Sequence, residues 1–146
     1  MKRFNFDLEN ILLLRKYREQ EAEIALGKEV MELNRIERNI ANLVQEKKHT
    51  SAERFRFGYV ISEMRVFDIY MQRLDWTKER LLEEAAKAEL KVEAARKVYL
   101  EAEREREVLD KMKEEEIRAH RKQGFSEEAK ILDDISNEVF IRNLRE

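Results

Sequence analysis

Few residues in this chain have the types and spacing that chemistry requires. The sequence contains two histidines, His49 and His120, and no cysteine. A metal site or a nucleophile activated by a base needs several such groups close together, and these two fall in different predicted segments. His120 instead suits the end of a helix, where a positive charge complements the helix dipole. We therefore predict no metal site and no catalytic residues.

Carboxylates and glycines give no stronger signal for catalysis. Neighbouring acids such as Glu83 and Glu84 could in principle act as an acid and a base, but an exposed helix surface offers no pocket to shift their pKa values. Gly27 stands alone, without the further glycines of a phosphate-binding loop. We predict that the protein is not an enzyme and needs no cofactor.

The composition indicates long helices instead of a compact globular fold. The chain has 146 residues, with no proline, three glycines and 42% charged residues. Residues that form turns are too scarce for a fold with many short elements. The 30 basic and 32 acidic side chains are interleaved, which gives no basic field for nucleic acid. No apolar run resembles a membrane span or a signal peptide, so we expect a soluble cytoplasmic protein.

The second half of the chain carries a heptad repeat. Steps of four and three residues from Val60 to Leu109 visit fifteen positions, of which thirteen are apolar and two are charged, Lys78 and Arg106. A period of 3.5 residues sustained over this length is typical of a coiled-coil seam, the line of positions that faces a partner helix.

The first half repeats the pattern less regularly. The residues that take heptad steps are Leu26, Val30, Leu33, Glu37, Ile40 and Val44. Earlier residues fit an eleven-residue spacing better, namely Ile11, Leu14, Arg18, Ala22 and Ala25. We predict a first helix at about 5–54 and a second at about 59–122, in one domain that spans 1–146.

Both patterns lapse before Gly58, so the turn is predicted at about 55–58 and the two helices should pair antiparallel. Facing residues then have numbers with a constant sum. A sum of 115 would place Glu37 opposite Lys78 and Glu9 opposite Arg106, which would neutralise both charged seam positions. The alternative is that the Lys and Arg side chains reach out to water. The same register pairs Val44 with Met71, and Val30 with Ala85.

The chain after Gly124 is predicted to form a separate short helix. Basic residues precede Gly124, which suits a helix C-terminus, and Ser126 is a good start for a new helix at about 126–144. Leu132, Ile135 and Val139 line one face of that helix. The predicted fold is therefore all-α: a long antiparallel two-helix coiled-coil hairpin with a short C-terminal helix.

A second apolar line runs along the outer side of the second helix. Its members, called the outer stripe below, are Tyr59, Val66, Ile69 and Trp76, flanked by Tyr70. Outer heptad positions normally face water, so the outer stripe predicts either a surface for a protein partner or a surface covered by the C-terminal helix.

Two segments resemble the FliJ proteins of the bacterial flagellar export apparatus. They are the opening run from Phe4 to Arg15, followed by Glu19 and Ala22, and the run from Lys130 to Ile135. The resemblance implies a non-catalytic cytoplasmic stalk that inserts into the hexameric export ATPase. It also implies contacts with the cytosolic domain of the export gate and with export chaperones. Such a protein would lie at the inner face of the membrane through protein contacts alone, and would serve flagellum biogenesis, chaperone escort, motility and chemotaxis.

In that role the free end of the hairpin would contact the ATPase ring, and the outer stripe would contact the gate or a chaperone. The residues expected at the ring, called the open-end residues, are Leu8, Ile11, Arg15, Leu109 and Met112. We expect a monomeric hairpin when the chain is free. Two alternatives remain open: a homodimeric structural rod, whose seam joins two chains, and a helical-hairpin export chaperone that binds unfolded substrate directly.

Overall fold

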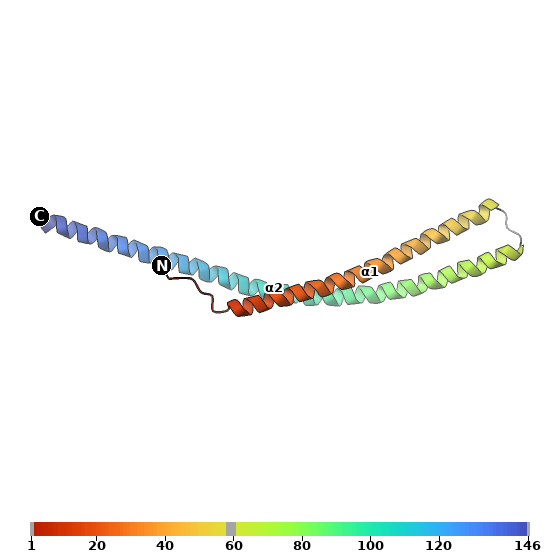
Figure 1. Cartoon of the computed structure of the whole chain (residues 1–146), viewed down its shortest axis with the longest axis horizontal. Coiled ribbons are helices and arrows are strands. Elements are labelled where there is room, and N and C mark those ends of the chain that lie inside the picture. The colour runs from red at the N-terminus through yellow and green to blue at the C-terminus, as the bar shows by residue number, and fades with distance from the viewer. Residues whose placement is uncertain (1, 58–60, 146) are drawn as a thin grey trace. The chain divides into compact units, whose positions relative to one another are not determined.

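The computed structural model describes residues 2–57 and 61–145, without the side chains of residues 55–57, 61 and 62. Helix α1 spans Glu9–Phe57 and helix α2 spans Ile61–Arg145, and the described residues contain no strand (Figure 1). The prediction of an all-α fold with two long packed helices is confirmed. The predicted turn at 55–58 lies partly outside the described residues, because α1 continues through Phe57.

Contacts divide the chain into two compact units. One unit is Gln20–Glu101, which we call the hairpin unit, and the other combines Met1–Glu19 with Ala102–Glu146, which we call the terminal unit. Both helices contribute to each unit, and the two units are described separately below.

The hairpin unit is held together by a line of aliphatic side chains. Ile36 packs with Ala85 and Ala88, and Leu43 packs with Leu74 and Leu81, all of them buried. The α2 residues in both clusters occupy the predicted heptad positions, so the α2 seam is confirmed from Met71 to Ala88. Of the earlier predicted positions, Val60 lies outside the described residues and Met64 is exposed. At about 25 cal/mol per Å² of buried apolar surface, such a line is the main stabilising contribution in a two-helix structure.

The α1 seam differs from the prediction by one position in each heptad. Ile36 and Leu43 are buried, whereas Glu37 is exposed and Val44 only half-buried. The predicted and the observed seam share Leu33 and Ile40, which pack against the clusters. After Leu33 the predicted seam advances by four residues to Glu37, whereas the observed seam advances by three residues to Ile36. The observed order buries two aliphatic side chains and leaves the carboxylate in water.

The predicted register is wrong by one heptad. Lys47 forms an ion pair with Asp75, and Arg54 forms one with Asp68 at 3.6 Å. The residue numbers of each pair add to 122 instead of 115. The part of α1 and α2 that the structure describes shows no ion pair between Glu37 and Lys78. A coiled-coil pattern repeats every seven residues. Sliding one helix by seven residues therefore keeps the same apolar face against the other helix and changes only which residues face each other.

The ion pairs of the terminal unit also depart from the predicted register. Glu9 pairs with Lys113 at 2.8 Å, and Arg106 pairs with Glu19 instead of the predicted Glu9. The expected eleven-residue spacing is also absent, because Leu12 is fully buried while Ile11 is exposed.

Helix α1 begins later than predicted. Residues 2–8 are not helical, and the first turn is anchored by the Glu9 amide, which donates to the Phe6 carbonyl at 3.1 Å. Phe6 is buried, and the Phe4 ring meets the His120 ring edge-on with centroids 5.6 Å apart. The non-helical segment therefore packs against α2.

The prediction of a separate C-terminal helix is wrong. Helix α2 continues through Gly124 to Arg145, and every residue from 125 to 145 is exposed. Glycine within a helix costs about 1 kcal/mol relative to alanine, and the helix-favouring Glu127, Glu128 and Ala129 that follow outweigh it. Among the described residues, no separate helix follows α2. Within residues 2–57 and 61–145, neither helix has an apolar stretch long enough to span a lipid bilayer.

The observed register can be tested by crosslinking, since the natural chain contains no cysteine. Cysteines introduced as Ile36→Cys and Ala85→Cys should form an intrachain disulfide on oxidation, because the two residues are in contact. The control is Val30→Cys with Ala85→Cys, which the register of 115 would favour. Val30 lies about 9 Å along the helix from Ile36, so this pair should crosslink poorly. A faster reaction of the control, measured by gel shift, would overturn the observed register.

Candidate protein-interaction surfaces

The outer stripe forms an exposed apolar surface on the hairpin unit. Val66, Ile69 and Trp76 are 68%, 53% and 62% exposed, and they lie on the side of α2 away from the buried Leu74. Tyr59 lies outside the described residues. These three side chains are exposed within the chain, while their role in binding stays a prediction.

Tyr70, on the flank of the outer stripe, connects the two helices. Its hydroxyl donates a hydrogen bond to the Glu46 carboxylate of α1, and this bond raises the pKa of Tyr70. Nearby, the Arg54 guanidinium lies 4.8 Å from the centre of the Phe67 ring and also pairs with Asp68. These contacts fix the rotation of α2 relative to α1, and so they set the direction in which the outer stripe faces.

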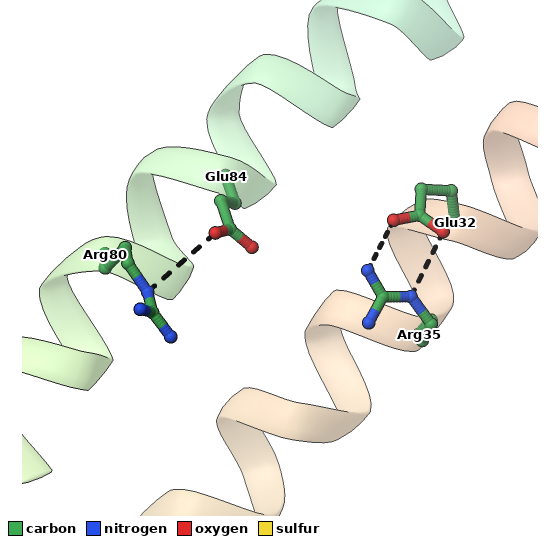
Figure 2. A network of polar contacts seen from close by, with 4 residues as sticks. All are labelled: Glu32, Arg35, Arg80 and Glu84. Atoms are coloured by element: carbon green, nitrogen blue, oxygen red, sulfur yellow. Dashed lines mark hydrogen bonds and ion pairs between the residues drawn. The ribbon is translucent and has the colours of Figure 1, made fainter.

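Charged side chains elsewhere on the hairpin unit form surface pairs within single helices. Figure 2 shows Arg35 bound to Glu32 through two nitrogens, and Arg80 beside Glu84 at 3.9 Å. The hydrogen bond from Arg35 lowers the pKa of Glu32 and raises the pKa of Arg35. Such pairs at spacings of three and four residues stabilise a solvated helix surface.

The open-end residues in the terminal unit do not form one uniform surface. Ile11 and Met112 are 44% and 38% exposed, whereas Leu8 and Leu109 are half-buried. Arg15 binds Glu105 of α2, so its guanidinium already has a partner within the chain.

A network of charges interrupts the apolar seam in the terminal unit. Arg106, at a seam position, binds both Glu19 of α1 and Asp110 of its own helix. These two carboxylates raise the pKa of Arg106, with Asp110 the larger influence. Only 16% of the Glu19 side chain is exposed, so its charge depends on Arg106 for compensation.

The C-terminal extension, residues 125–145 of α2, is a further exposed helix surface. Phe125, Leu132 and Val139 recur every seven residues and are 67%, 64% and 50% exposed. Leu132 and Val139 belong to the apolar face that the sequence predicts for a separate helix at about 126–144, whereas Phe125 lies before that predicted helix.

Comparison with known proteins decides the family. Residues 4–145 match the family model described as flagellar FliJ protein, a range that includes both helices completely. The chain belongs to the FliJ family. Neither a comparison with curated proteins nor one with solved structures gives a match.

Membership in the FliJ family makes the chain a component of the flagellar export apparatus, with a role in flagellum biogenesis and protein export. FliJ proteins are non-catalytic components of that apparatus. In the part of the chain that the structure describes, no group of three or more His, Cys, Asp or Glu side chains could hold a metal ion.

The charge network in this FliJ protein can be tested by removing Arg106. Arg106→Ala leaves the poorly exposed Glu19 without its cation, so we expect a loss of about 1–2 kcal/mol of stability, measured by thermal unfolding. The control Arg80→Ala removes an exposed pair within one helix and should change the melting temperature very little. Equal effects of the two substitutions would show that the Arg106 network does not stabilise the seam.

Proposed function

We propose that this protein is a non-catalytic coupling protein that links the hexameric export ATPase to the cytosolic domain of the export gate and to export chaperones. The observation that carries this proposal is the FliJ match over residues 4–145. The hairpin supports it, because a structure with one narrow seam leaves most side chains free for contacts with other proteins.

The outer stripe is the surface we propose for the gate or a chaperone. Large exposed apolar side chains grouped around a tryptophan are typical of binding hot spots. Trp76 and Ile69 contribute little to the seam, since both are more than half exposed. Partner binding can therefore use them without unfolding the hairpin.

The terminal unit is the part we propose for the ATPase ring. Among the open-end residues, Ile11 and Met112 are exposed and available, and the C-terminal extension adds a longer apolar face. This extends the original expectation, which placed the ring contact on the open-end residues alone.

We further propose that the protein acts at the inner face of the membrane through its protein partners, and that its contribution to motility and chemotaxis follows from flagellar assembly. The seam joins two helices of one chain, which favours a monomeric hairpin in dilute solution over a rod whose seam joins two chains.

The gate or chaperone contact is tested by Ile69→Ala combined with Trp76→Ala. We expect nearly unchanged melting and a weakening of binding by about 2 kcal/mol, or roughly 30-fold, measured by titration calorimetry. The matched control is Leu82→Ala with Leu100→Ala, which removes exposed leucines of α2 away from the line of Ile69 and Trp76. Full affinity of the outer-stripe variant for both the gate and the chaperones would exclude this surface.

The ring contact is tested by Leu132→Gln combined with Val139→Gln, because glutamine keeps helix propensity while removing the apolar face. Binding to the ATPase ring should fall at least about tenfold, with binding to the gate unchanged. The control, Ile131→Gln with Ile141→Gln, changes exposed residues outside the line of Leu132 and Val139. Unchanged ring binding by the first variant would remove the C-terminal extension from the proposal.

A further inference from the structure

We propose that the outer face of α1 is a self-association surface on which a second copy of this hairpin binds with its α1 parallel. The residues of this face, called the α1 stripe, are Gln20, Ile24, Gly27, Met31 and Asn34. Successive members are separated by four, three, four and three residues, which is a second heptad repeat on α1 beside the seam. The inference concerns the hairpin unit alone and does not depend on the proposed coupling function.

The α1 stripe faces away from α2. Ile24 and Met31 are 62% and 71% exposed, whereas the seam residues Ala22 and Ile36 are buried. A methyl group built on Gly27 would meet nothing within 4 Å, so the backbone there is open to a close neighbour. Next to it lies a groove of about 500 Å³ lined by Met31, Asn34, Glu37, Arg38 and Ala41.

Charges beside the α1 stripe favour a second copy as the occupant. Glu23 precedes Ile24 and Lys28 follows Gly27, so they occupy the two flanking positions that carry interhelical ion pairs in coiled coils. In a parallel pair, Glu23 of each copy comes beside Lys28 of the other. In the described part of the chain neither side chain has an ion pair of its own, so both charges are available to a neighbour.

A parallel register also matches the residue types across the interface. Ile24 meets Ile24 of the second copy, Met31 meets Met31, and the amides of Gln20 and Asn34 can hydrogen-bond to their own counterparts. An antiparallel register that brings Glu21 beside Lys28 would instead set Met31 against Gln20, an apolar side chain against an amide.

A charge ends the α1 stripe on its C-terminal side. Arg38 comes next in the heptad and would meet its own copy, and its Nε already donates to the Asn34 carbonyl at 3.4 Å. Amides and a glycine occupy three of the five stripe positions, so little apolar surface is buried. The dimer should therefore be weak and should form only at high protein concentration.

Sedimentation velocity of the full chain tests this, at concentrations from about 10 μM to about 1 mM. The wild type should shift from monomer towards dimer, and Ile24→Glu should lower the association constant at least about tenfold. The matched control is Leu90→Glu, which changes an exposed apolar residue of α2 and should associate like the wild type. A wild type that stays monomeric throughout, or an Ile24→Glu variant that associates like the control, would overturn the proposal.

Charge and orientation are tested in the same assay. Glu23→Lys should weaken association, and adding Lys28→Glu should restore it, because the swapped pair is again complementary. A single Gln20→Cys should give a disulfide-linked dimer only if the two α1 helices are parallel and in register. No recovery in the double variant, or no crosslink at Gln20→Cys while dimers form, would overturn the parallel arrangement.

Discussion

The burial of one aliphatic line on α1 against one on α2 is the constraint on which the rest of the hairpin unit depends. Ile36 and Leu43 from α1 meet Leu74, Leu81 and Ala85 from α2. Helices of this length gain most of their stability from packing along such a face and little from propensity alone. Because the interface is a line and not an enclosed core, most side chains outside it stay in water, and function must use helix surfaces.

Ion pairs between the helices select the register of α1 against α2, which the aliphatic line alone leaves undetermined. A heptad seam can slide by seven residues and still bury the same faces, so apolar packing alone does not select the register. Lys47 with Asp75, and Arg54 with Asp68, are satisfied together in one register of the hairpin unit. In the terminal unit a charge occupies the seam itself, since Arg106 stands at a seam position and pairs with Glu19 and Asp110.

Much of this architecture is predictable from the sequence, and the failures have physical causes. The seam of α2 follows from a regular repeat of buried types, and the exposure of Ile69 and Trp76 follows from their outer positions. The register was misplaced because the charges of Glu37 and Lys78 were assumed to need each other, whereas Glu37 is exposed to water. The C-terminal boundary was misplaced because Gly124 was given the meaning of a helix end, although strong helix formers on both sides extend the helix through it.

The C-terminal extension has a consequence for how it would bind a partner. No residue from 125 to 145 is buried, so within this chain that segment lacks the packing that stabilises α2 elsewhere. An unsupported helix of about 20 residues is only marginally stable in water, and a glycine at its start weakens its link to the preceding turns. A partner that covers Phe125, Leu132 and Val139 therefore stabilises the helix as it binds. Part of the contact energy is spent on that ordering, which lowers the affinity and makes the contact easier to release. Such a contact would suit the coupling role proposed above.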